Sequence, residues 1–538
     1  MKNIVLLGGS NSVMVNGLQK GLREYANVTN LALGGSTSIQ NLYELYRPRN
    51  QEAIQNADLI VTESNINEIH QHLNMREQLD INIIFRNMQY LYSSLYCLQK
   101  PVCIILLPTF HQKKYIVINN MHKYLANFYG FYIISLHDYY KEHHIVEFGN
   151  KFGHHQLNIV NRILGQYISK NINSFISSNK QLEISMPDFQ VITPENMKHD
   201  SVLTIFNPKN SVFDEITYRL KNNDTLKFIN CFGYQIIGIH SWLLEDDGQI
   251  SKIPVDSAQF QCGSMAIITK KGTIIKSTSK LNRFFELQVE PIITEDLTIG
   301  FNHLKLPDTE FYSMAISNHQ NSIIIPYFDL IAFLLCKPNP KMKLFDLSVI
   351  PSDRDIEINP ELDCSYLIPN IVFFKDSMEF IDEYISHLYP NIVKHMHSAL
   401  VPDVLKRTNA ELVAPFKQEV ELLKEKIQAL EAKNSTPAQP PKPATPQPIP
   451  QEIEIKALKE KLAQKEQELI NMKDKFDKQN TNISVLENNY QKALNTKNHL
   501  SYKLGQALIK ANKNWYKGGY IKFIFEVMRI KKEHKNRG

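Results

Sequence analysis

The stretch that decides the fold opens the chain and runs Ile4-Val5-Leu6-Leu7-Gly8-Gly9-Ser10-Asn11-Ser12. The apolar run Ile4–Leu7 is typical of a buried strand, and the two glycines after it permit a tight turn. A small residue before Ser10 lets this turn lift the hydroxyl above the sheet edge. The helix expected next would direct backbone N–H groups toward a developing oxyanion.

Two further strands are expected to end in the same way. The first runs into Asn30-Leu31-Ala32-Leu33-Gly34-Gly35-Ser36-Thr37-Ser38, and the second into Asp58-Leu59-Ile60-Val61-Thr62-Glu63-Ser64-Asn65-Ile66-Asn67-Glu68. A hydroxyl, a glycine turn and an amide therefore meet along one sheet edge. Ligands bind at this edge in open α/β sheets.

Residues 1–172 alternate short apolar runs with amphipathic segments. The runs are Ile4–Leu7, Val28–Leu33, Leu59–Thr62, Val102–Leu106 and Tyr132–Leu136, and the segments lie near 13–25, 38–46, 80–98, 115–129 and 156–171. Strands that alternate with helices predict a parallel sheet covered on both faces. We therefore expect a three-layer α/β domain over 1–172.

The middle of the chain has a different pattern. Residues 183–310 carry short β-rich runs separated by turn residues such as Lys271-Gly272, which predicts a sandwich-like domain. Residues 311–405 are expected to form a mixed α/β extension with a helix over Ser377–Leu388.

Beyond residue 405 the apolar residues follow a heptad period. The first seam, within 407–433, and the second, within 452–504, flank a Pro-rich linker over 434–451. A sustained period of 3.5 favours supercoiling with a partner helix, so we expect a parallel homo-oligomer. The two seams consist of Val413, Phe416, Val420, Leu423, Ile427 and Leu430, and of Ile455, Leu458, Leu462, Leu469, Met472, Phe476, Ile483, Leu486, Tyr490, Leu500 and Leu504.

Charge and composition indicate the cellular location of the protein. Ten Lys and Arg and two Glu give Lys503–Gly538 a net charge of +8, so the rest of the chain carries −3 of the total +5. Six scattered cysteines without a C-x-x-C pair favour a reducing compartment. Neither a secretory signal nor a membrane-spanning run is expected, since Ile323–Cys336 is broken by Pro326 and Asp329. We expect a cytoplasmic protein, peripheral at the inner membrane.

The three N-terminal blocks resemble the SGNH (GDSL-like) hydrolase family. Ser10 matches the family's nucleophile, Gly35 its glycine after the second strand, and Asn67 its asparagine after the third. The resemblance implies an oxyanion hole formed by the N–H groups of Ser10 and Gly35 and the side chain of Asn67. It also implies a histidine base before the last helix, for which His155 is the first choice and His154 the alternative.

The chain departs from the family pattern at three positions. Phe152 stands where the family has an aspartate three residues before the histidine, Gly9 replaces the acidic residue before the serine, and Asn65 replaces the third block's glycine. A backbone carbonyl or water can orient the imidazole instead, because orientation is the main role of that aspartate. Asp138 is a further candidate, although its position does not match the motif.

Each feature also has a purely structural interpretation. Ser10 could cap a helix, Gly34-Gly35 could be only a turn, and Asn67 could form an Asx-turn. No metal site is expected: His143-His144 lacks nearby carboxylate or thiolate partners, and Asp246-Asp247-Gly248 lacks the later ligand positions of a calcium loop.

The basic aromatic tail, 505–538, alternates aromatic residues with lysines, which suits an anionic membrane surface better than nucleic acid. Ser501–Gly505 and Trp515–Tyr520 resemble a C-terminal segment of bacterial capsule and lipooligosaccharide biosynthesis proteins. That resemblance implies a shared docking site where polysaccharide is assembled.

The expected function is transfer of an acyl group, usually acetyl, to a carbohydrate hydroxyl, or esterase action if water is the acceptor. The β-rich domain over 183–310 would then bind the glycan. No cofactor is expected, apart from a donor such as acetyl-CoA in a transferase. Two alternatives remain: transfer of a phosphoryl-type substituent to capsule sugars, and a non-catalytic glycan-binding or scaffold protein.

Overall fold

The computed structural model describes residues 1–35, 37–73, 79–110, 115–251, 261–310, 323–434, 453–471, 474, 523 and 526–529. The chain divides into two units, Met1–Asp382 and Glu383–Gly538. The linker from residue 435 to 451, the second heptad seam beyond residue 471 and almost all of the basic tail lie outside the described residues.

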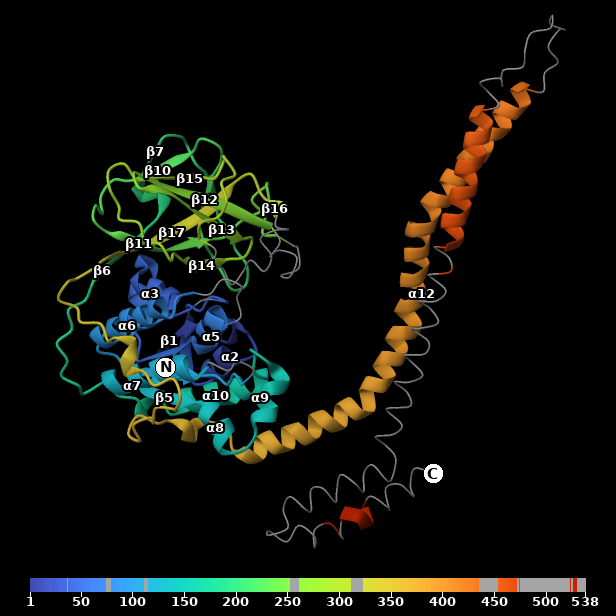
Figure 1. The fold of residues 1–538 in the computed structure, drawn as a ribbon. Coiled ribbons are helices and arrows are strands. Elements are labelled where there is room, and N and C mark those ends of the chain that lie inside the picture. Colours follow the sequence, from blue (N-terminus) through green and yellow to red (C-terminus); the bar gives the residue numbers. More distant parts are fainter. Residues whose placement is uncertain are drawn as a thin grey trace, which may run out of the picture. The chain divides into compact units, whose positions relative to one another are not determined.

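The first unit opens with a five-stranded parallel sheet of order β2-β1-β3-β4-β5 (Figure 1). Both faces of the sheet are covered, because alternate residues of β1 enter two different hydrophobic cores. Val5 and Leu7 belong to the first core, and Ile4 and Leu6 belong to the second. This confirms the predicted α/β fold. The strands are β1 Lys2–Gly8, β2 Ala26–Asn30, β3 Leu59–Glu63, β4 Val102–Leu106 and β5 Tyr132–Ser135.

Helices lie on both faces of the sheet. Helices α2 and α10 pack so closely that only glycine fits at their contact. A Cβ atom added at Gly21 would lie 1.9 Å from a carbonyl oxygen of α10, and one added at Gly165 would lie 2.5 Å from a carbonyl oxygen of α2. This contact draws the chain before α10 toward the end of β1. The helices are α1 Ser10–Val13, α2 Leu18–Leu22, α3 Ser38–Tyr46, α4 Gln51–Gln55, α5 Asn65–Leu73, α6 Ile81–Cys97, α7 Tyr115–Tyr129, α8 Leu136–Glu142, α9 Val146–Phe152 and α10 Asn158–Lys170, with 3-10 turns η1 Pro48–Asn50 and η2 Ile172–Ser174.

Two mainly antiparallel sheets form the β-rich middle, as the sequence predicts. One has the order β13-β12-β15-β10-β7 with β16 beside β12, and the other β14-β11-β17-β9-β8 with β6 beside β17. Their elements are β6 Asp188–Ile192, η3 Pro194–Asn196, β7 Met197–His199, β8 Thr204–Phe206, β9 Thr217–Leu220, β10 Thr225–Phe228, β11 Gln235–Ser241, β12 Gln261–Thr269, β13 Gly272–Ser279, β14 Arg283–Glu286, β15 Thr298–Phe301, β16 Ile323–Ile324 and β17 Phe328–Lys337.

The strands continue past residue 310, where the sequence analysis placed a domain boundary. β17 explains the difference, because its side chains alternate between two cores. Phe333 and Leu335 enter the sandwich core, whereas Leu334 and Cys336 enter the core shared with the α/β domain. A strand buried on both faces is continuously apolar and shows no alternation in the sequence.

After β17 the chain returns to the α/β domain. Ile133 of β5 donates its N–H to the carbonyl of Leu362 and accepts from the N–H of Cys364, each at 2.9 Å. The 3-10 turns η5 Leu347–Val349 and η6 Ser365–Leu367 precede the long helix α12, Ile371–Asn434. Phe374 anchors the start of α12 in the second core, fully buried. The expected helix Ser377–Leu388 is thus part of α12.

In the second unit, the end of α12 pairs with the helical segment 453–471 in an antiparallel arrangement. Ion pairs join Glu419 to Lys465, Lys424 to Glu466 and Glu431 to Lys459. The buried residues of this part of α12 are Val420, Leu423 and Ile427, three members of the first seam. No helix among the described residues is both long and apolar enough to cross a membrane. The homo-oligomer stays a prediction.

Candidate active site

The Oγ of Ser10 lies 2.7 Å from the Nε2 of His155. Ser10 begins the one-turn helix α1 directly after β1, and His155 lies in the segment between α9 and α10. The ring of His154 instead packs edge-on against His70, with 5.0 Å between ring centroids. Of the two adjacent histidines, His155 therefore faces the hydroxyl.

The glycine loop after β2 and the start of α5 both border Ser10, because β1 lies between β2 and β3 in the sheet. A Cβ added at Gly34 would lie 3.9 Å from the Cβ of Ser10, and Gly35 adopts a φ of 70° that favours glycine. A Cβ added at Gly9 would lie only 2.0 Å from the Nδ2 of Asn67. The structure thus brings together the elements that carry all the predicted site residues.

Phe152, at the position where the resembled family has an aspartate, ends α9 and packs against Phe148 with 5.2 Å between ring centroids. Among the described residues, the His155 ring makes one hydrogen bond, which is the contact with Ser10. The backbone holds this segment instead: the N–H of His155 donates to the carbonyl of Phe152, and the Nδ2 of Asn11 donates to the carbonyl of His154 at 3.1 Å. Burial lowers the pKa of His155.

Asp138, the other acidic candidate, forms an ion pair with Lys123, with 2.8 Å between Oδ2 and Nζ. Among the residues that the structure describes, no three His, Cys, Asp or Glu side chains are placed to hold a metal ion.

A buried carboxylate that the sequence analysis did not single out lies beneath the nucleophile turn. The Oε1 of Glu63 accepts hydrogen bonds from the N–H of Gly9 and from both the N–H and the Oγ of Ser12. Burial raises the pKa of Glu63 to about 7, against the lowering effect of these bonds. A signal was available in the sequence, because a charged residue ends the apolar run Leu59–Thr62.

A second buried carboxylate, Glu68, ties together three helices around the site. Its Oε1 accepts from the N–H of Ser38 at 2.9 Å, and its Oε2 lies 2.8 Å from the Nε2 of His122, whose Nδ1 contacts the hydroxyl of Tyr92. Burial acts to raise the pKa of Glu68, but His122 and Ser38 outweigh it, and the net shift is downward. Glu68 thereby links α5, which carries Asn67, to the start of α3.

The β-rich sandwich contacts the glycine loop between β2 and α3. The hydroxyl of Thr37, two residues after Gly35, donates to the buried carboxylate of Glu286 on β14. Asn65 takes a structural role in place of the family's glycine: its side chain bonds both the N–H and the carbonyl of Leu107, beyond the end of β4. The loops around Ser10 are therefore fixed from two domains.

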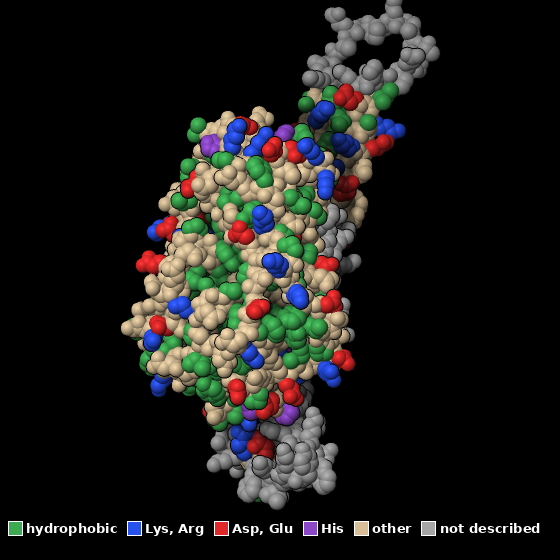
Figure 2. All heavy atoms as spheres, turned by 90° about the vertical axis from the view of Figure 1, so that its left-hand side faces the viewer, with side chains coloured by type: hydrophobic (Ala, Val, Ile, Leu, Met, Phe, Trp, Pro, Cys, Tyr) green, Lys and Arg blue, Asp and Glu red, His purple; other side chains and the backbone are tan. Residues whose placement is uncertain are grey.

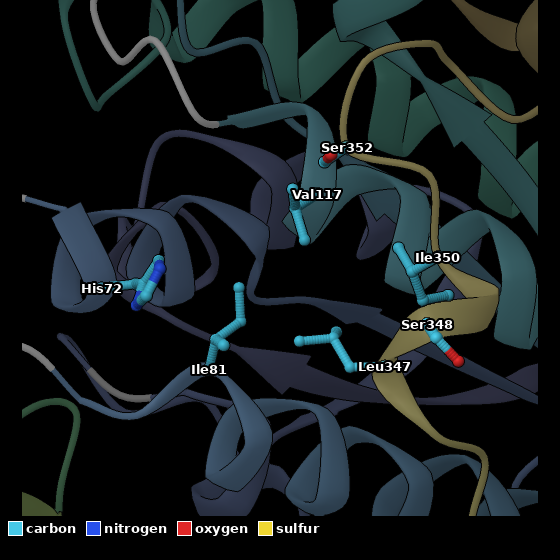
Figure 3. A pocket seen from close by; sticks show the side chains of 7 residues that line it. All are labelled: His72, Ile81, Val117, Leu347, Ser348, Ile350 and Ser352. Carbon is cyan, nitrogen blue, oxygen red and sulfur yellow. The ribbon is translucent and has the colours of Figure 1, made fainter.

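A cavity of about 430 Å³ is lined by none of the predicted site residues (Figure 3). Ile81 and Val117 point into it from the starts of α6 and α7, and Leu347 lines it from the returning chain. His72, which also lines it, follows Asn67 on α5 by five residues, or about 140° around the helix axis. The cavity is thus separate from the Ser10–His155 pair.

Comparison with known families and proteins gave few matches. Residues 453–536 match a family described as "Domain of unknown function (DUF8374)". No curated protein matched the chain.

Among solved structures, an α/β hydrolase enzyme from the metagenome of Lake Arreo, Spain, is 10% identical, with 31% of this chain and 92% of that chain covered and a TM-score of 0.27. A GDSL-like lipase from Bacteroides thetaiotaomicron is 16% identical (32% and 88% covered, TM-score 0.26). The acetylxylan esterase Axe2 from Geobacillus stearothermophilus is 13% identical (32% and 94% covered, TM-score 0.26).

Proposed function

We propose that this protein is an SGNH-type acyltransferase or esterase with Ser10 as nucleophile and His155 as general base. The observation that carries the proposal is the 2.7 Å contact between Ser10 Oγ and His155 Nε2, made at the carboxyl edge of a parallel sheet. Nucleophilic catalysis by serine needs a base within this distance. The N–H groups of Ser10 and Gly35 and the side chain of Asn67 would form the oxyanion hole, in which hydrogen-bond donors stabilise the developing charge.

The reaction would proceed in two steps. Ser10 Oγ attacks the acyl carbonyl while its proton passes to His155 Nε2, and the tetrahedral intermediate expels the donor's leaving group, which takes that proton. In the second step His155 removes a proton from the acceptor hydroxyl, the acceptor oxygen attacks the acyl-serine, and Ser10 is released with its proton restored. The backbone contacts at Phe152 and Asn11 would keep the imidazole in place.

A carbohydrate hydroxyl is the proposed acceptor, with acetyl the proposed acyl group. Two features support it. The sandwich, which we propose binds glycan, contacts the loop after Gly35 through Thr37 and Glu286. The tail resembles a segment of capsule biosynthesis proteins, and a role in building surface polysaccharide favours a transferase, with a donor such as acetyl-CoA, over an esterase. One face of the first unit shows acidic and basic side chains interspersed (Figure 2).

Labelling with a fluorophosphonate probe tests the nucleophile. We expect wild-type protein to be labelled and Ser10→Ala to remain unlabelled. A wild-type protein that the probe does not label, and that does not hydrolyse p-nitrophenyl acetate, would instead support a non-catalytic glycan-binding protein.

The substrate is tested in a strain that carries Ser10→Ala, by mass spectrometry of its surface polysaccharide. Loss of 42 Da per modified residue, roughly the mass of one acetyl group, is the expected result. A loss that corresponds to a phosphoryl-type group would support the alternative transfer reaction. An unchanged polysaccharide would refute catalysis by Ser10 in this pathway.

A further inference from the structure

The turn that carries Ser10 begins with two glycines, which have no side chain to hold it. Gly8 and Gly9 precede the serine, and neither can be replaced freely. A Cβ at Gly9 would collide with Asn67, and a Cβ at Gly8 would lie 2.6 Å from Ser12 Oγ and 2.8 Å from Glu63 Oε1. Whatever fixes this turn must therefore come from another element.

Asn30 of β2 supplies one contact, because its Nδ2 donates to the carbonyl of Ser12 at 2.9 Å. The larger share comes from Glu63. Its backbone pairs with Gly8 in the β1–β3 ladder, so its side chain starts directly beside the turn. Its Oε1 accepts from Gly9 N–H at 2.9 Å, Ser12 N–H at 3.2 Å and Ser12 Oγ at 2.9 Å. The side chain is almost fully buried, with 2% of the residue exposed.

These three bonds bracket the nucleophile, since one donor lies immediately before Ser10 and two lie on the residue two positions after it. Above the pKa of Glu63, which is about 7, these bonds go to a carboxylate and are stronger than bonds to a neutral acceptor, and burial strengthens them further. We propose that Glu63 is a positioning residue, which holds the Gly9–Ser12 turn so that Ser10 Oγ faces His155 and Ser10 N–H faces the oxyanion. This inference rests on the proposed function of Ser10.

Two substitutions separate positioning from bulk stability. Glu63→Gln keeps an oxygen that can accept from the turn, whereas Glu63→Met fills the space without an acceptor. We expect Glu63→Met to lower kcat for p-nitrophenyl acetate by about 10- to 100-fold with little change in KM, because misplacement of a reacting group by about 1 Å costs that much. Glu63→Gln should restore most of kcat. Glu52→Met, at an exposed glutamate of α4, is the matched control and should leave kcat unchanged.

Hydrogen exchange in a peptide that spans residues 8–14 gives a readout independent of activity. We expect faster exchange of the Gly9 and Ser12 amides in Glu63→Met than in the wild type. Unchanged exchange, or wild-type kcat in folded Glu63→Met, overturns this inference. Equal losses of kcat in the Gln and Met variants, in proportion to lost thermal stability, overturn it as well. Failure of the proposed function is a different result, in which wild-type Ser10 neither reacts with fluorophosphonate nor turns over ester.

Discussion

His155 Nε2 and Ser10 Oγ lie 2.7 Å apart although 145 residues separate them in the chain. His154 contributes its carbonyl to Asn11 and packs its ring against His70. We therefore predict that His155→Ala lowers kcat for small acyl esters by about 10²- to 10⁴-fold, the usual contribution of a general base. His154→Ala should stay within about tenfold of wild type, since its contact with Asn11 uses the backbone. A larger loss in His154→Ala than in His155→Ala would reverse the assignment.

The pH dependence of kcat/KM should report the neutral form of His155. Because burial lowers the pKa of this imidazole, it loses its proton below the usual value of 6.5. Activity should rise with pH through a midpoint below that value and then level off. A rate profile measured with p-nitrophenyl acetate checks this. A midpoint clearly above 6.5 would contradict the burial of the base.

Gly9→Ala should damage the site more than Gly34→Ala does. The added methyl group at Gly9 would lie 2.0 Å from Asn67 Nδ2, so the asparagine must move from its place beside Ser10. At Gly34 the nearest atom is the Cβ of Ser10 at 3.9 Å, an ordinary contact. We expect a loss of kcat of at least about tenfold for Gly9→Ala, with little loss for Gly34→Ala. Equal activities would show that Asn67 plays no part at this position.

Glu286 should make the protein less stable as pH rises. Burial raises the pKa of Glu286 to about 7, above its value of about 4.3 in an unfolded chain, so the native state keeps a proton that the unfolded chain has released. The stability that this protonated carboxyl contributes is fully present below the unfolded pKa, about 4.3, and is lost as pH rises through the folded pKa, about 7. This difference in pKa corresponds to at most about 4 kcal/mol of stability.

Glu286→Gln removes this titration while it keeps an acceptor for Thr37. The free energy of unfolding of the variant, relative to that of wild type, should therefore be larger at about pH 8 than at about pH 5, so that the variant gains relative stability as pH rises. Urea denaturation at the two pH values measures the difference. Parallel curves for variant and wild type would show that Glu286 is not the group that titrates.

Deletion of 472–538 tests the role of the tail while it leaves the antiparallel pair of α12 and 453–471 intact. A cut at residue 452 would instead remove the partner segment of Val420, Leu423 and Ile427. We predict that the protein without 472–538 retains ester hydrolysis but no longer sediments with membranes in cell fractionation. Continued sedimentation would refute anchoring by the tail. Light scattering of both forms tests the predicted homo-oligomer, which should be lost with the part of the second seam that begins at Met472.

The layered fold followed from local patterns in the sequence. The run Val102–Leu106 coincides with β4 and the segment near 38–46 with α3, because burial on two faces gives strands a continuous apolar run and burial on one gives helices a 3.6-residue stripe. The same reasoning placed a domain boundary at residue 310 and missed β17 as part of the sandwich. The two faces of β17 are buried in different cores, and an apolar run does not by itself indicate which elements will cover it.

Sequence alone placed Ser10, Gly35 and Asn67 at neighbouring strand ends, since a glycine turn after a buried strand is a local feature. Only the tertiary structure decided which histidine meets Ser10, because that depends on the close packing of α2 against α10, between residues more than 140 apart. It also decided that Glu63 lies beneath the nucleophile turn and that Glu286 bonds Thr37. Such contacts are set by strand order and domain docking, and their physical basis is the requirement that each buried polar group find a partner from whichever element lies beside it.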